Sequence, residues 1–273
     1  MKTFNYGEDE LQALDLYQPK EWNGKTLVLI HGGGWWQGDK GKEKEVATGL
    51  ATEGYQVAAL NYRLATQAKN LFPTQDEDVE AAYTWLLKNI PDFKADNIAF
   101  IGGSTGGHLA AYLGLTKGRP FVSLSGLLDL KGFYENHKET IPKQLIIAPD
   151  LPSKKIDQAG ANDSYYKWII ENLLASINDD SLEKASIFSK VTKKSGPGLL
   201  CNSMNELVPA YEHQKLAELL RQEQISVETC LLSGSRHGEA YIDDIWPNLL
   251  NFLKRYISVS YTHLRAHETA ANL

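Results

Sequence analysis

The sequence predicts an α/β fold built on a doubly wound, mostly parallel sheet. Apolar runs alternate along the chain with segments of helical periodicity, and the runs are apolar throughout, not only at every second residue. Strands of this kind are buried on both faces, as they are when helices cover both sides of a parallel sheet. The 273 residues, 42% of them hydrophobic, suit one large α/β domain or two small ones.

Each expected element follows from its local pattern. Short apolar runs predict strands, and apolar residues at helical spacing, in one case after an acidic first turn, predict helices. The expected strands are residues 26–30, 55–62, 97–101, 120–126, 197–202 and 227–233. The expected helices are residues 42–53, 76–90, 107–115, 210–223 and 243–257.

One segment breaks this alternation. Residues 131–190 are polar, interrupted by proline and only partly helical. The segment is either an ordinary crossover or a cap-like insertion over the carboxyl ends of the strands, where doubly wound sheets bind ligands. Connections this long usually have a function, so we expect a cap within a single domain of residues 1–258.

Composition excludes several function classes. A net charge of −6, a pI near 5.7 and scattered lysines argue against a nucleic-acid partner or an anionic membrane surface. No apolar run resembles a signal core or a membrane span, so we expect a cytoplasmic protein. The two cysteines, Cys201 and Cys230, lack metal-ligand spacing, and no metal site is expected.

The stretch "IGGSTGGHLAAYL" contains G-x-S-x-G between an expected strand and an expected helix. That context is the one in which a serine forms a nucleophile elbow. Ser104 is the expected nucleophile, and Gly102 and Gly106 leave room for the strand and helix to approach. Both nucleotide-binding alternatives fail, because the stretch has no lysine for a P-loop and the wrong glycine spacing for a dinucleotide fingerprint.

A nucleophilic serine needs a base. His237 follows an expected strand in a polar turn, at the same edge of the sheet as Ser104. His31 is expected to support the glycine loop, and His108 lies one turn into the helix after the nucleophile. His137 and His213 are expected on the insertion and on a helix surface. His237 is therefore the expected general base.

The stretch "HGGGWW" directly follows the expected strand 26–30. Backbone N–H groups without side chains can surround a developing oxyanion closely. We expect donors from Gly33 and Gly34, with a third from Thr105, the residue after the nucleophile. Trp35 is the expected substrate-binding residue, although large aromatic residues also commonly pack in cores.

Together, "HGGGW", the elbow and "RHG" resemble the carboxylesterase branch of the α/β-hydrolases, close to hormone-sensitive-lipase-like and acetyl- or feruloyl-esterase-like enzymes. The resemblance also includes "LDLYQP", "LNYRLA" and "SLSGLLDL", and covers most of residues 10–250 in the family's order. It implies an α/β-hydrolase fold and a Ser-His-acid mechanism that needs no cofactor.

One position departs from the family. The family usually places its acid four residues before the proline of a D-x-x-V-P turn, where this chain has Asn205, followed by Glu206. An amide orients the histidine but does not balance its charge, and the equivalent change in serine proteases costs about 10⁴ in kcat. We expect Glu206 to be the acid. The alternatives are a weak triad with Asn205, an acid elsewhere in the chain, or a sequencing error that turned an Asp codon at position 205 into an Asn codon.

The last residues need separate treatment. Residues 259–269, "VSYTHLRAHET", resemble a translated sequencing-library adaptor. We therefore expect residues 259–273 to be a non-native tail, which removes His263 and His267 from the candidates.

The expected function is hydrolysis of small-molecule esters with short acyl groups, since the 131–190 segment is too polar for the lid of a long-chain lipase. Two alternatives keep the fold: an arylformamidase or amidase that uses the same triad, and a ligand-binding homologue with weakened catalysis, suggested by Asn205. The sequence does not predict the alcohol moiety or the oligomeric state.

Overall fold

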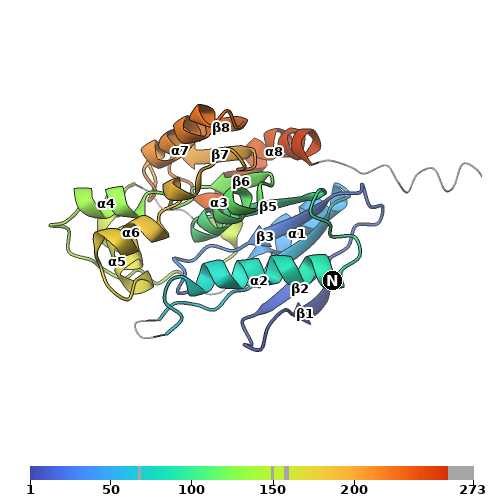
Figure 1. The fold of residues 1–273 in the computed structure, drawn as a ribbon, viewed down its shortest axis with the longest axis horizontal. Coiled ribbons are helices and arrows are strands. Elements are labelled where there is room, and N and C mark those ends of the chain that lie inside the picture. Colours follow the sequence, from blue (N-terminus) through green and yellow to red (C-terminus); the bar gives the residue numbers. More distant parts are fainter. Residues whose placement is uncertain (67–68, 149–150, 157–159, 258–273) are drawn as a thin grey trace, which may run out of the picture.

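The computed structural model describes residues 1–66, 69–148, 151–156 and 160–257. Within them, one eight-stranded sheet has the order β1-β2-β4-β3-β5-β6-β7-β8 (Figure 1). The strands are β1 (Lys2–Asn5), β2 (Ala13–Tyr17), β3 (Thr26–Ile30), β4 (Gln56–Leu60), β5 (Ile98–Gly103), β6 (Phe121–Leu124), β7 (Gly198–Ser203) and β8 (Val227–Leu232).

The predicted doubly wound, mostly parallel sheet is confirmed. Strands β3 to β8 are parallel to one another, and β3 lies between β4 and β5. The antiparallel strands β1 and β2 were missed by the sequence analysis. Their pattern is weak, because β1 is largely exposed and β2 carries a buried charge, Asp15, which pairs with Lys40.

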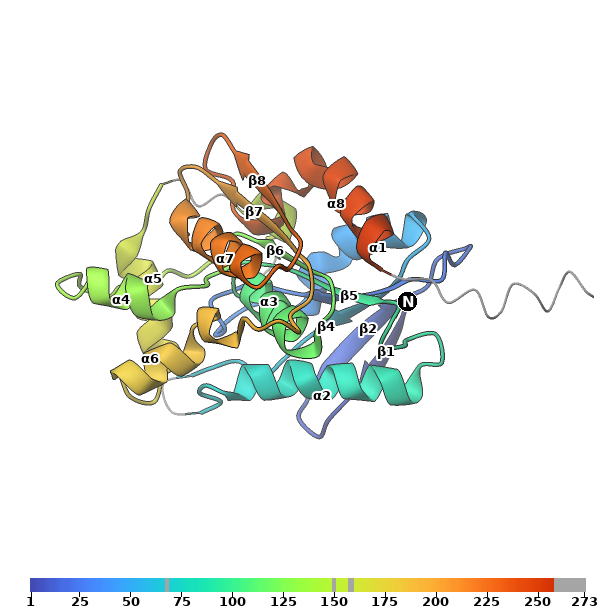
Figure 2. The same cartoon turned by 45° about the horizontal axis from the view of Figure 1, so that its top comes forward.

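Helices cover both faces of the sheet (Figure 2). One face packs against α1 (Lys44–Thr52) and α8 (Ile242–Tyr256), and the other against α2 (Thr74–Asn89), α3 (Thr105–Lys117) and α7 (Ala210–Gln222). The central strands are therefore buried on both sides, which explains why their sequences are apolar throughout. The predicted helices differ from these bounds by only a few residues.

The connection from β6 to β7 contains the segment predicted as an insertion. Its helices are α4 (Leu130–Asn136), η2 (Ser153–Lys155), α5 (Asp163–Leu173), α6 (Asp179–Ala185) and η3 (Phe188–Lys190). Although the segment is polar overall, α5 buries Tyr166, Ile169 and Ile170 in the core. Two short turns elsewhere, η1 (Lys40–Glu43) and η4 (Gly238–Tyr241), carry side chains of the site. The proposed tail, 259–273, lies outside the described residues.

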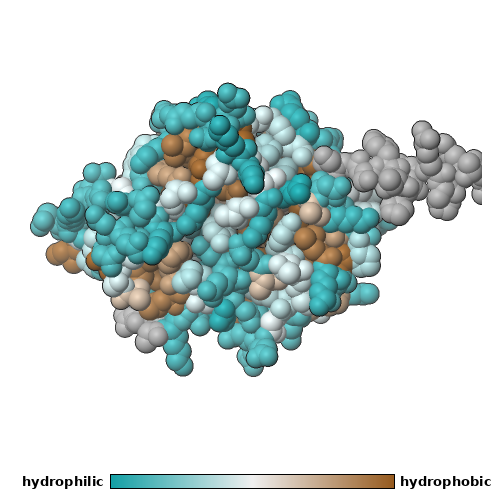
Figure 3. All heavy atoms as spheres, viewed as in Figure 1, coloured by the Kyte–Doolittle hydropathy of each residue, from teal (hydrophilic) through white to brown (hydrophobic). Residues whose placement is uncertain are grey.

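The face seen in Figure 3 is mostly hydrophilic, with small hydrophobic patches between charged side chains. Across the described residues, no helix has both the length and the apolar character needed to cross a membrane.

Candidate active site

The site lies where parallel strands end. Ser104 directly follows β5, Ser125 directly follows β6, Glu206 is in the loop after β7, and His237 is in the loop after β8. The glycine loop that starts at Gly32 follows β3. Because these strands are parallel neighbours, their carboxyl ends bring five loops to one edge of the sheet.

Ser104 has the backbone expected of an elbow. Its φ is 55° and its ψ is −127°, and helix α3 begins at the next residue. A Cβ atom at Gly102 would lie 2.3 Å from the carbonyl oxygen of Gly106, and one at Gly106 would lie 2.0 Å from that of Ile30. Only glycine fits these two positions, as the G-x-S-x-G pattern predicts.

The glycine loop lies directly against Ser104. A Cβ atom at Gly32 would be 2.9 Å from the Cβ of Ser104, so the backbone passes where no side chain fits. Gly33 and Gly34 have φ angles of 119° and 66°. No hydrogen bond among the described residues uses the N–H groups of Gly33, Gly34 or Thr105. Three predicted donors are therefore unpaired beside Ser104.

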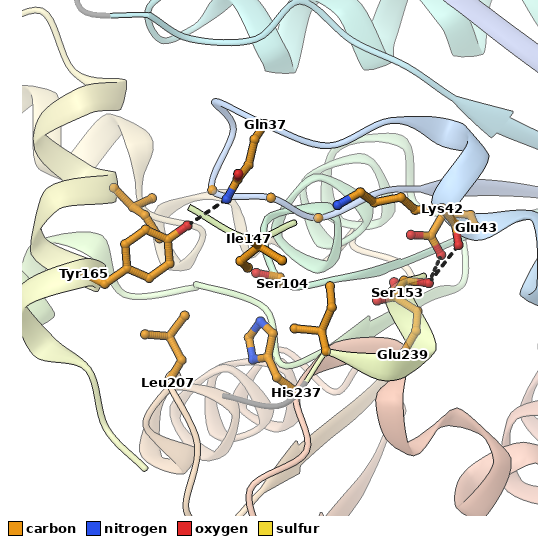
Figure 4. Close-up of a pocket in the computed structure, with 15 residues that line it drawn as sticks. Gln37, Lys42, Glu43, Ser104, Ile147, Ser153, Tyr165, Leu207, His237 and Glu239 are labelled. Atoms are coloured by element: carbon orange, nitrogen blue, oxygen red, sulfur yellow. Dashed lines mark hydrogen bonds between the residues drawn. The ribbon is translucent and has the colours of Figure 1, made fainter. Parts of the chain in front are cut away.

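His237 and Glu206 form a buried pair. Both residues are 4% exposed, and the Nδ1 atom of His237 contacts the Oε2 atom of Glu206 closely. The other ring nitrogen, Nε2, is buried and has no partner among the described residues. Figure 4 shows the imidazole beside Ser104. A carboxylate at Nδ1 fixes the proton there, which leaves Nε2 as an acceptor.

Sequence reasoning missed Ser125, whose hydroxyl connects Glu206 to the loop that carries His237. Its hydroxyl donates to Oε1 of Glu206 at 2.7 Å and accepts from the N–H of Gly238 at 2.9 Å. The N–H of Ser203 also donates to Oε1, at 2.8 Å. No sequence signal indicated Ser125, because the expected strand 120–126 contained it, whereas β6 ends at Leu124.

Asn205 does not take part in this arrangement. Its side chain is exposed, and its backbone binds Gly234 and Gly160 at 3.0 Å each. Glu206 contacts His237 instead. It lies one residue after the position where the family usually has its aspartate, and its side chain is one methylene group longer than that of aspartate.

Trp35 and His213 differ from expectation. The indole of Trp35 is 1% exposed and packs edge-on against His108 at 4.9 Å, so it belongs to the core and does not line the pocket. His213, expected on a helix surface, is buried and accepts from the N–H of Gly126 at 3.2 Å. In both cases helical or loop position gave no information about burial.

His31 and His108 are buried and have structural contacts. His31 stacks on Tyr62 at 4.4 Å and contacts the carbonyl oxygen of Gly32, which supports the glycine loop. Burial lowers the pKa of His31 to about 4, and it does the same for His108, so both rings are neutral at physiological pH.

Ser104 and His237 open into a pocket with little free space, about 30 Å³. One end is apolar, with Tyr165, Ile169 and Leu207 on its wall. Tyr165 is the aromatic residue of the 131–190 segment that reaches the pocket, and its hydroxyl accepts from Gln37 at 3.3 Å. The other end is polar and lined by Lys42, Glu43, Ser153 and Glu239 (Figure 4).

The fold and this arrangement define an α/β-hydrolase of the carboxylesterase branch. The chain belongs to the BD-FAE family, whose model matches residues 14–220. Two curated relatives are similar over most of this chain. Esterase LipC of Mycobacterium tuberculosis is 25% identical over 256 residues, which cover 87% of this chain but only 59% of LipC. A kynurenine formamidase of Meyerozyma guilliermondii is 25% identical over 248 residues, 88% of each chain.

Solved structures show the same fold. Esterase B from Lactobacillus rhamnosis superposes with a TM-score of 0.71 at 20% identity, over 98% of this chain and 88% of that one. A carbohydrate esterase from gut microbiota also gives 0.71 at 20% identity, over 93% of this chain and 95% of that one.

Proposed function

We propose that this protein is a serine carboxylesterase for small esters with short acyl groups. The observation that carries the proposal is the buried Glu206–His237 pair, whose free Nε2 lies beside a serine on an elbow. Esterase relatives and the BD-FAE family support the same activity.

In the proposed mechanism, Nε2 of His237 takes the hydroxyl proton as the Oγ of Ser104 attacks the ester carbonyl. Glu206 holds the Nδ1 proton and stabilises the imidazolium. The N–H groups of Gly33, Gly34 and Thr105 bind the oxyanion that forms. The alcohol leaves with the proton from His237, and a water activated by the same ring then hydrolyses the acyl-enzyme.

Hydrolysis of p-nitrophenyl acetate tests this proposal. The wild-type protein should release p-nitrophenol, and Ser104→Ala should abolish turnover and labelling by a fluorophosphonate. Equal activity in the two proteins would exclude Ser104 as the nucleophile. A series of p-nitrophenyl esters tests acyl length, for which the small free space and apolar wall support acetyl to butyryl groups. A kcat/KM maximum at eight carbons or more would contradict this preference.

A second candidate is an arylformamidase on the same triad, favoured by the formamidase relative that matches over nearly its full length. Turnover of N-formylkynurenine compared with acetyl esters distinguishes the two. The alternative of a weakened, ligand-binding homologue rested on Asn205, and the contact between Glu206 and His237 removes that reason. A cytoplasmic location and the lack of nucleic-acid or membrane partners stay predictions from the sequence.

A further inference from the structure

The polar end of the pocket holds two buried acids that the proposed mechanism does not use. Glu43 comes from η1 and Glu239 from η4, so segments far apart in the chain meet there (Figure 4). They are 1% and 4% exposed. Burying a carboxyl group costs folding free energy unless its polar atoms are paired, so the presence of two such groups in the pocket indicates a function.

Glu239 has an unmet hydrogen-bonding atom. Its Oε1 is buried, and no described residue is its partner. The carboxyl group lies against the backbone of Gly103, where an added Cβ would be 2.3 Å from Oε2. Because Gly103 precedes Ser104 and Glu239 lies two residues after His237, the free oxygen is next to the reacting groups.

Glu43 accepts a hydrogen bond from Ser153. Its Oε2 lies 3.0 Å from the hydroxyl of Ser153, which also lies 3.2 Å from the carbonyl oxygen of Lys42. Ser153 has one proton to donate, and a carbonyl oxygen only accepts. Ser153 therefore offers one proton to two acceptors, so this hydrogen bond only partly satisfies the buried carboxyl group of Glu43.

The surrounding charges agree with a proton on the pair. Burial raises the pKa of Glu43 well above its ordinary value, and the charge of Glu239 raises it further, while the hydrogen bond from Ser153 and the charge of Lys42 lower it. Burial also raises the pKa of Glu239 to about 7, while nearby His237 lowers it. Two buried carboxyl groups that line the same end of a pocket and repel each other when both are charged favour one shared proton.

We propose that Glu43 and Glu239 form a subsite that binds a hydroxyl group on the alcohol part of the ester, a few bonds from the carbonyl. The subsite rests on the proposed esterase function and adds two specificity-determining residues to it. A carboxyl pair with one proton can both accept and donate, which matches a hydroxyl group. An alkyl group in the same place would leave Oε1 of Glu239 unpaired. A cationic group would bind well only if the carboxyl pair lost its proton, and the positive charge of Lys42 in the same end of the pocket would repel it.

Matched acetate esters test the subsite. 2-Hydroxyethyl acetate and propyl acetate differ by a hydroxyl in place of a methyl group, and acetylcholine places a cation there. Released acetic acid is titrated at constant pH, and each kcat/KM is divided by the rate of the hydroxide-catalysed reaction to remove intrinsic reactivity. The wild-type protein should prefer the hydroxyethyl ester over the propyl ester by at least about tenfold.

Three variants locate the preference. Glu239→Met has similar length without polar atoms and should bring the ratio close to one. Glu239→Gln supplies a neutral donor and acceptor and should retain much of the preference. Glu228→Gln, on β8 and paired with Arg255 outside the pocket, should keep the wild-type ratio. Circular dichroism and fluorophosphonate labelling of Ser104 verify that each variant is folded.

The outcomes separate the two proposals. A wild-type ratio near one, an unchanged ratio in Glu239→Met, or a preference for acetylcholine overturns the subsite while p-nitrophenyl acetate is still hydrolysed. A protein that hydrolyses none of these esters overturns the esterase function, and the subsite with it.

Discussion

Replacing Glu206 by glutamine reverses one hydrogen bond in the proposed triad. Oε1 of Glu206 accepts from Ser125 and from the N–H of Ser203, so the amide oxygen of a glutamine should take that place. The amide NH₂ then faces Nδ1 of His237 and donates to it. The imidazole proton moves to Nε2, the nitrogen that has to accept the proton of Ser104.

The expected loss follows from this wrong tautomer. The equivalent Asp-to-Asn change in a serine protease lowers kcat by about 10⁴, or about 5.4 kcal/mol of transition-state stabilisation. Glu206 is 4% exposed, so little water reaches the pair to relieve the mismatch. We expect Glu206→Gln to lower kcat by about 10³ to 10⁴ with the fold retained.

Initial rates with p-nitrophenyl acetate measure the effect, and thermal unfolding verifies the fold. Asn205→Ala is the matched control, because it removes the neighbouring amide at an exposed position and should stay within about twofold of wild type. More than a tenth of wild-type activity in Glu206→Gln, or a hundredfold loss in Asn205→Ala, would refute this assignment of the acid.

Gly32→Ala places a Cβ 2.9 Å from that of Ser104 and should lower stability by about 1–3 kcal/mol and nearly abolish esterase activity, as denaturant unfolding and kinetics will show. Ser125→Ala leaves the N–H of Gly238 without its partner and should lower stability by a similar amount, with kcat reduced about tenfold; a wild-type kcat would show that this hydroxyl does not position the acid. Burial raises the pKa of Glu239 from 4.5 to about 7, so the native state holds this proton more tightly than the unfolded chain. The resulting stabilisation is full below pH 4.5 and is lost as the pH rises to about 7. Thermal unfolding should therefore show Glu239→Gln gaining stability relative to wild type between pH 5 and pH 8, and a difference independent of pH would contradict the raised pKa.

The central sheet could be predicted because its strands are buried on both faces, which leaves a continuous apolar signal. Strand β1 lies at the sheet's edge and is largely exposed, and β2, next to it, is buried but contains Asp15, which pairs with Lys40, so neither has a continuous apolar signal. Sequence alone does not indicate such a pairing, since it joins residues from separate loops and strands.

The site was predictable where chemistry requires a particular residue in a particular local context. Ser104 and the glycine loop follow strands directly, and only glycine tolerates the close approach at Gly32. The pair of Glu43 and Glu239 was not predictable, because it depends on two turns meeting in space. For Trp35 the prediction was wrong. Its place after the glycine loop suggested that it lines the pocket, but its backbone has a φ of 61° and its side chain is buried in the core.

The contact of Glu206 with His237 changes how related sequences should be judged. In the proposed triad the acid is displaced by one residue along the loop, and one additional methylene group lets Glu206 reach His237. A position-by-position comparison finds an amide where an aspartate is usual and assigns such a chain to the inactive members. Relatives that carry an amide followed by glutamate in this turn should therefore be counted among the active enzymes until their turnover is measured.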